Sequence, residues 1–202
     1  CPHQLDLWQW ICGMPSKIRA FCHEGKWHDI EVEDDVTIYA EYPGGATGTF
    51  ISSTGEFPGA NRLEITMEKA KIVCEGNTLK VAELTQPLPE FTKTATGGFD
   101  KPKVEWKEIK VDPSGHQHEI VLNAFAAHIL RGEPLIAEGP EGINGLMISN
   151  AAFLSSWLGH AVDLPVDEDL FWSMLQDKIK KSTYQKTVNT NVKTDMSSSY
   201  QI

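Results

Sequence analysis

The chain has 202 residues, a formal net charge of −10 and a hydrophobic content of 41%. This length allows a full hydrophobic core. The acidic balance argues against non-specific binding to nucleic acid or to an anionic membrane, which both need basic surface. No apolar run is long enough to span a membrane. The 4 cysteines show neither CxxC pairing nor zinc-ligand spacing, which favours reduced thiols of a cytoplasmic protein over disulfides.

The first fifteen residues, CPHQLDLWQWICGMP, carry a complete helix signal. Leu5, Trp8 and Cys12 recur at three- and four-residue spacing and form one apolar stripe. His3 and Asp6 lie on the first turns, away from most of that stripe. Because the sequence starts with Cys and inside this motif, we expect it to be a piece of a longer polypeptide.

Alternating apolar residues predict a run of about seven strands after this helix. They cover residues 16–24, 27–33, 36–42, 46–53, 62–68, 71–75 and 78–84. The following stretch, 87–102, is rich in Pro, Thr and Gly and predicts a long surface loop. A further strand is expected over 104–111, where a slip in the apolar phase indicates a bulge or burial on both faces.

The pattern then changes to helical spacing. Helices are predicted over 116–131, 140–158 and 167–181, with a short extended segment at 162–165. Residues 1–181 are therefore expected to form one domain, and the polar residues 182–202 a mobile tail. This order predicts the α+β class, a large open and mainly antiparallel sheet with helices on one face. The sequence contains no Gly-rich phosphate-binding loop.

His3 is the first candidate for chemistry. A surface histidine at a helix start is the simple explanation. However, the positive end of a helix favours a neutral imidazole, which can accept a proton. Asp6, or a carboxylate upstream of the sequence, would complete an acid/base pair.

His116 and His118 form an HxH pattern before a predicted helix. A third metal ligand at suitable spacing is missing nearby, so helix capping or substrate contact is favoured over a metal site. The remaining candidates have structural explanations: solvated or packing histidines, core tryptophans on helical stripes, and acidic turn residues. They are His23, His28 and His160; Trp8, Trp10, Trp157 and Trp172; and Asp34 and Asp35.

The first fifteen residues resemble the first helix of the C-terminal domain of the Gfo/Idh/MocA oxidoreductases. That family is named for glucose–fructose oxidoreductase and inositol dehydrogenase. The similarity continues through GANRLEITMEKAKIV, through the helix entry at His116 with Phe125, and through GEPLIAEGPEGINGLMISNAAFLSSWLGHAVDLPVD. It covers about residues 1–166.

The resemblance implies a two-domain NAD(P)-dependent dehydrogenase for a sugar, a cyclitol or a related polyol. A Rossmann domain before Cys1 would bind NAD or NADP, so no cofactor-binding residue is expected here. This chain would be the substrate-binding and oligomerisation domain, similar to the second domain of glyceraldehyde-3-phosphate dehydrogenase. One sheet face would form a homodimer or a tetramer, and the fragment alone would be inactive.

By residue, the resemblance gives His3 the role of the catalytic histidine and Asp6 a supporting role behind it. His116 matches a position often near the substrate, and Ser52 and Ser53 are expected to shape the pocket. The alternative from another class is a non-catalytic binding or scaffold protein that keeps the oxidoreductase fold. A metal-dependent enzyme using the HxH pattern is the third possibility.

Overall fold

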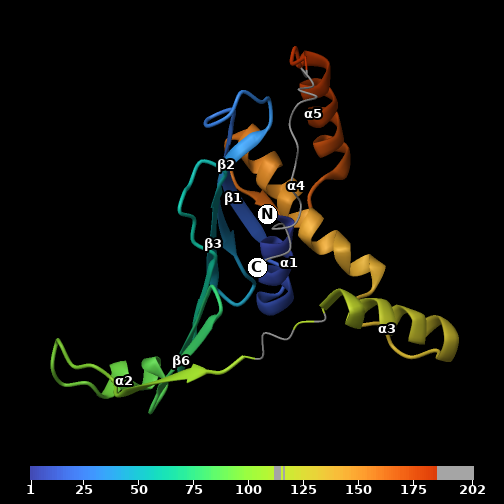
Figure 1. Ribbon diagram of the computed structural model, residues 1–202. Helices are drawn as coiled ribbons and strands as arrows, with labels where there is room; N and C mark the ends of the chain where they lie inside the picture. Colours follow the sequence, from blue (N-terminus) through green and yellow to red (C-terminus); the bar gives the residue numbers. More distant parts are fainter. Residues whose placement is uncertain (112–114, 116, 186–202) are drawn as a thin grey trace. The chain divides into compact units, whose positions relative to one another are not determined.

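A computed structural model of the chain describes residues 1–111, 115 and 117–185 (Figure 1). Among these residues the chain divides into two compact units. Unit 1 consists of residues 1–57 and 124–185, and unit 2 of residues 58–111, 115 and 117–123. Unit 1 is therefore built from two separate stretches of the sequence. Helix α3 (Gln117–Arg131) runs across the division between the units.

The sheet of unit 1 contains β1 (Lys17–Glu24), β2 (Glu33–Glu41), β3 (Thr47–Ser53) and the short β8 (Val162–Asp163). The strand order is β3-β2-β1-β8, and all neighbours are antiparallel. Ile18 pairs with Ala40 and Ala20 with Ile38, and all four side chains are at most 1% exposed. Placing a branched side chain opposite a small one lets the helices approach this face closely.

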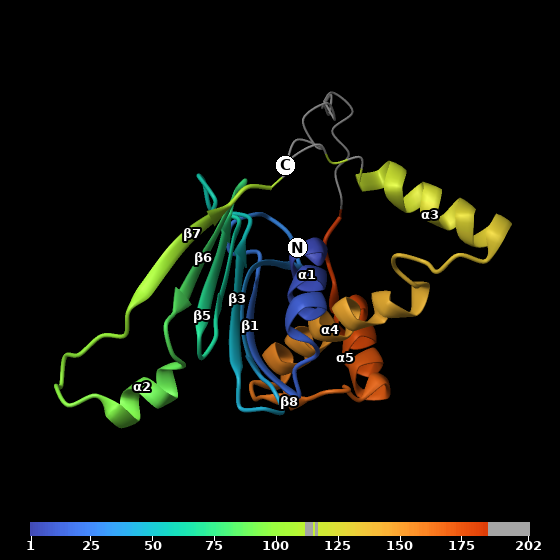
Figure 2. The ribbon, with the colours of Figure 1, turned by 90° about the horizontal axis from the view of Figure 1, so that it is seen from below.

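Two helices cover the buried face of this sheet (Figures 1 and 2). They are α1 (Pro2–Cys12) and α4 (Gly142–Leu158). Leu5 and Trp8 of α1 join Ile148 and Leu154 of α4 in one hydrophobic core. The helix α5 (Glu168–Lys181) begins at the N-cap Asp167, whose carboxylate accepts the Leu170 N–H. Its residues Phe171 and Met174 pack against the same core.

Two serines of α4 connect that helix to β1. The Ser155 hydroxyl accepts the Ala20 N–H at 3.0 Å and donates to the His160 carbonyl at 2.7 Å. The Ser156 hydroxyl accepts the Cys22 N–H at 3.0 Å. Because β8 pairs with only the first two residues of β1, these serines satisfy strand N–H groups that lack a strand partner.

Unit 2 holds a second antiparallel sheet, of order β4-β5-β6-β7. Its strands are β4 (Arg62–Thr66), β5 (Ala70–Glu75), β6 (Thr78–Leu84) and β7 (Val104–Ile109). The short helix α2 (Leu88–Thr94) lies between the last two strands in the sequence. Within the described part of this unit, Val73 and Ala82 are the only hydrophobic residues that are buried.

The predicted α+β class and its antiparallel pairing are confirmed, and the strands lie in two four-stranded sheets. The strand predicted over 27–33 is wrong, because residues 25–32 form a loop between β1 and β2. Asp34 and Asp35 are not turn residues, since both lie within β2. The Asp34 carboxylate accepts hydrogen bonds from the backbone N–H groups of residues 26–28. In a strand, these N–H groups would instead donate to the carbonyl groups of a neighbouring strand.

Three further expectations need correction. The predicted loop 87–102 contains α2. The predicted slip in the next strand is neither a bulge nor double burial, because β7 pairs regularly with β6 and all its residues are exposed. Trp10 and Trp172 are 75% and 60% exposed and do not belong to the core, whereas Trp8 does.

The predicted tail falls mainly on residues 186–202, outside the described residues. Ser182 and Thr183 at its start both donate hydrogen bonds to the Glu31 carboxylate. The 4 cysteines are all free thiols. Among the described helices, none combines the length and the apolar character needed to cross a bilayer.

Candidate active site

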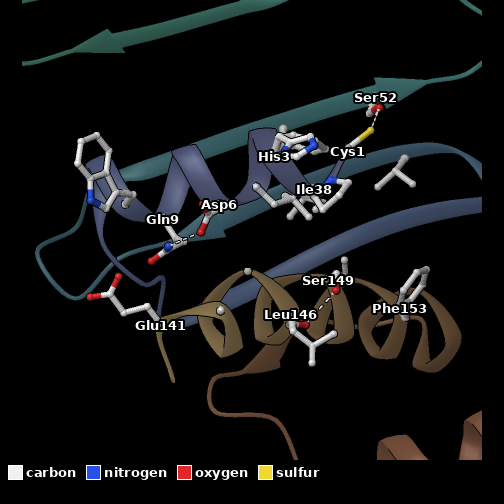
Figure 3. A pocket seen from close by; sticks show the side chains of 18 of the residues that line it. Cys1, His3, Asp6, Gln9, Ile38, Ser52, Glu141, Leu146, Ser149 and Phe153 are labelled. Atoms are coloured by element: carbon white, nitrogen blue, oxygen red, sulfur yellow. Dashed lines mark hydrogen bonds between the residues drawn. The ribbon is translucent and has the colours of Figure 1, made fainter. Parts of the chain in front are cut away.

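A cavity of about 1030 Å³ lies within unit 1, lined by α1, β2, β3, α4 and the segment 136–142 (Figure 3). Ile38, Phe50 and Phe153 supply apolar walls. Polar side chains come from α1, from the end of β3 and from the segment before α4. A cavity of this size, apolar with a few convergent polar groups, is typical of a small-molecule binding site.

Helix α1 presents two different faces. Leu5 and Trp8 point into the core, where Trp8 stacks on Phe50 with ring centroids 6.0 Å apart. Gly48 is required beneath this ring, because a Cβ there would lie 2.6 Å from Trp8 Cζ2. His3, Asp6 and Trp10, spaced three and four residues apart, share the other face and line the cavity. The helix therefore joins the core to the candidate site.

The structure places the predicted His3 on the cavity wall, with an exposed side chain (Figure 3). Asp6 lines the same cavity, and its Oδ1 accepts a hydrogen bond from Gln9 Nε2 at 2.9 Å. No hydrogen bond joins Asp6 to His3 within the described part of the chain. The carboxylate is therefore oriented by Gln9, one turn further along the helix.

The two predicted serines of β3 lie on different faces of the strand. Ser52 lines the cavity and is hydrogen-bonded to Cys1 Sγ (Figure 3). Ser53 is not among the cavity-lining residues, and its hydroxyl accepts the Gly55 N–H. Thr54 lines the cavity again. This alternation is that of a strand, so Ser52 and Thr54 can contact a ligand together.

His116, the other predicted substrate contact, lies outside the described residues. His118 is at the start of α3. Among the residues that the structure describes, no group of three or more His, Cys, Asp or Glu side chains is placed to hold a metal ion.

Sequence reasoning missed Asp34, a buried carboxylate that lines the cavity. It accepts backbone N–H groups from Lys26 at 2.9 Å, Trp27 at 2.7 Å and His28 at 2.9 Å. Burial raises the pKa of this carboxyl, but these hydrogen bonds outweigh burial and leave the pKa below its ordinary value. Asp34 therefore stays ionised and holds the β1–β2 loop.

The backbone of Asp34 also positions a cavity residue. Its carbonyl accepts the Thr54 N–H at 2.9 Å, and Thr54 Oγ1 lies 3.1 Å from His28 Nδ1. The sequence contains a signal for this role, since Asp34 falls in the same alternation as Val36, Ile38 and Ala40. That phase predicts burial, and a buried carboxylate needs several hydrogen bonds.

The charged side chains that line the cavity are almost all acidic. Five carboxylates line it: Asp6, Glu33, Asp34, Glu138 and Glu141. None of the described residues lining the cavity is a lysine or an arginine. His3 is the one lining side chain among them that can become a cation.

These features define a class of protein: an α+β domain with a ligand cavity between helices and an antiparallel sheet, and with a histidine at the first turn of the helix that borders it. Residues 1–73 match the sequence model of the GFO/IDH/MocA C-terminal domain. The predicted resemblance to the C-terminal domain of the Gfo/Idh/MocA oxidoreductases is confirmed over these residues.

Solved structures agree with this assignment. The WlbA dehydrogenase from Chromobacterium violaceum, in complex with NADH and UDP-GlcNAcA, is 25% identical with a TM-score of 0.62. The match covers 82% of this chain and 44% of that one. WlbA from Bordetella pertussis, with the same ligands, is 21% identical with a TM-score of 0.58, covering 82% and 45%.

A levoglucosan dehydrogenase in complex with NADH and levoglucosan has the same fold, at 17% identity and a TM-score of 0.61. This match covers 82% of the chain and 49% of the dehydrogenase. The chain thus spans less than half the length of these structures. No curated protein sequence matches it significantly.

Proposed function

We propose that this chain is the substrate-binding and oligomerisation domain of an NAD(P)-dependent dehydrogenase that oxidises a hydroxyl group of a sugar, a cyclitol or a related polyol. The observation that carries the proposal is the position of His3, exposed at the first turn of α1 on the wall of a large cavity. Three similar structures were solved in complex with NADH and a sugar derivative, which supports the cofactor and the substrate class.

In this function His3 accepts the proton of the substrate hydroxyl as the carbon is oxidised, and returns it in the reverse reaction. Asp6, oriented by Gln9, places a carboxylate on the same helix face as His3. Ser52 and Thr54 orient other hydroxyls, and Ile38 and Phe50 exclude water from one wall.

The described cavity lining contains no lysine or arginine, and the sequence has no Gly-rich loop of the kind that binds dinucleotide phosphates. We therefore assign no residue of this chain to the phosphates of NAD or NADP and expect another part of the complete protein to bind them. The nicotinamide would supply the acceptor for the hydride.

The proposed homo-oligomer, a dimer or a tetramer, would use the sheet face of unit 1 opposite the core. Phe21, Tyr39 and Ile51 lie on that face, 52%, 43% and 70% exposed. The Arg19 guanidinium stacks over the Phe21 ring at 4.3 Å. Exposed apolar side chains across neighbouring strands are typical of an interface. The proposed location is the cytoplasm.

The test is His3→Gln in the complete protein, measured as reduction of NAD⁺ and of NADP⁺ with a panel of sugars and cyclitols. We expect kcat to fall by about 10²- to 10⁴-fold, the usual contribution of a general base. The matched control is His160→Gln, because His160 is exposed outside the cavity lining and should leave kcat unchanged. Full activity of His3→Gln would refute the catalytic role.

The second candidate function is a non-catalytic binding or scaffold protein with the same fold. The scaffold and the dehydrogenase make different predictions about binding and reduction of the nicotinamide cofactor. A complete protein that neither binds nor reduces NAD⁺ or NADP⁺, yet forms oligomers, would support the scaffold.

A further inference from the structure

The described cavity lining carries five carboxylates and neither lysine nor arginine. Its five carboxylates come from α1, from β2 and from the segment that precedes α4. They therefore come from three separate segments of unit 1. Because the walls between them are partly apolar, the negative potential is only weakly screened inside.

Two basic side chains of the same unit, Lys26 and Arg19, bind groups outside the cavity lining. Lys26 forms an ion pair with Asp35, which points to the sheet face opposite Asp34. The Arg19 guanidinium donates to the carbonyl oxygens of Ala20 and Ser155. Neither residue lines the cavity. Within the described part of the chain, no fixed cation compensates the carboxylates there.

Two of the carboxylates are already engaged by the protein. Asp34 is satisfied by three N–H groups, and Asp6 accepts from Gln9. Glu138 is the N-cap of the short 3₁₀ helix η1 (Gly139–Glu141), Glu141 is its last residue, and both are exposed. Their oxygens are acceptors that a ligand hydroxyl can reach by donating a hydrogen bond.

The same cavity offers an aromatic surface. Trp10 lines it while keeping three quarters of its side chain exposed. The apolar C–H face of a sugar ring can cover such an indole ring, while the hydroxyls at the ring edge donate to carboxylates. An anionic group entering this site would lose hydration, and His3 is the one described lining side chain that could offer it a positive charge.

From these observations we infer that the cavity binds an uncharged sugar or polyol and discriminates against anionic relatives such as sugar acids, sugar phosphates and nucleotide sugars. This inference rests on the proposed function and narrows its substrate class. It separates this chain from the WlbA structures, whose ligand UDP-GlcNAcA carries an anionic diphosphate. The ligand of the levoglucosan dehydrogenase carries no phosphate.

The test compares binding of matched neutral and anionic ligands to the complete protein: myo-inositol with myo-inositol 1-phosphate, and glucose with glucuronate. Titrations followed by ligand-observed NMR report binding without requiring turnover. We expect the neutral member of at least one pair to bind more tightly, on the order of tenfold at low ionic strength. Added salt should reduce that ratio.

The double variant Glu138→Gln/Glu141→Gln should reduce the preference several-fold, mainly through tighter binding of the anion. The double variant Glu41→Gln/Glu168→Gln changes the net charge equally at exposed positions outside the cavity lining and should leave the ratio unchanged. Equal effects of the two double variants would overturn the assignment to the cavity.

Equal or tighter binding of the anion in both pairs would overturn the inference, and so would binding of none of the four ligands. The proposed function fails in a different way. A neutral ligand that binds with the expected preference, but reduces neither NAD⁺ nor NADP⁺, would refute the dehydrogenase and leave the charge discrimination standing.

Discussion

The sheets of the two units are alike in their hydrogen bonding and unlike in their burial. Each has four antiparallel strands with a regular register over most of its length. In unit 1, Ile18 and Ile38 are completely buried beneath α1 and α4. In the described part of unit 2, only Val73 and Ala82 are buried hydrophobics. Antiparallel strands can pair through local hydrogen bonds alone, but one face of a sheet becomes a hydrophobic core only when helices cover it.

The strongest way to test this comparison is to remove the same side chain from both units. Ile148→Ala, at a completely buried position of α4, should lower the free energy of unfolding by about 2–5 kcal/mol. Ile72→Ala in β5 should cost less than half of that, because Ile72 is only half-buried. Chemical denaturation combined with hydrogen exchange would assign each loss to its unit, and equal costs would contradict the comparison.

A second contrast concerns carboxylates. Asp34→Asn in unit 1 removes the charge that accepts three N–H groups, so the amides of Lys26, Trp27 and His28 should exchange faster, on the order of tenfold. Glu64→Gln in unit 2 breaks ion pairs with Arg62 and Lys71 that are partly exposed, and should change exchange little. A comparable response of the two sheets would show that burial of the carboxylate is unimportant.

The smallest effect is expected at acid pH. Hydrogen bonds from Lys26 and from the Trp27 indole lower the pKa of Asp35 to about 2. An unfolded aspartate has a pKa of about 3.9. The folded pKa is depressed, so the stabilisation is present above about pH 4 and is lost as pH falls toward 2.

The melting temperature of the wild type should therefore fall more steeply over this interval than that of Asp35→Asn. Identical slopes would contradict the role given to Asp35. The opposite sign, a wild type that loses stability more slowly than the variant, would contradict the direction of its pKa shift.

Local patterns were sufficient for most elements. Helix α1 ends where Gly13, with its positive φ, was expected to end it, and the strands of both sheets follow the alternation of apolar residues. The stretch predicted as a strand over 27–33 alternates through Ile30 and Val32, but residues 27–32 form a loop. The interaction that decides its structure comes from Asp34, later in the chain, and periodicity within the stretch does not contain it.

The candidate site shows the same limit. The motif around His3 was sufficient to predict a residue that lines the cavity, and Ser52, predicted to shape the pocket, lines it too. The contribution of Glu138 and Glu141 could not be predicted, because their segment reaches the cavity only when α4 packs on β1 and α1. Trp10 was assigned to the core because a helical stripe does not reveal whether a neighbour covers it.

The hydrogen bond between Ala20 and Ser155 joins residues 135 positions apart within unit 1. During synthesis, α1 and β1–β3 leave the ribosome long before α4 does, while the whole of unit 2 is made in between. Over that interval the apolar face around Ile18 and Ile38 lacks the helix that covers it in the folded protein. The nascent chain therefore exposes an apolar sheet face until translation passes Ser155. This is the interval in which we expect a chaperone to bind it.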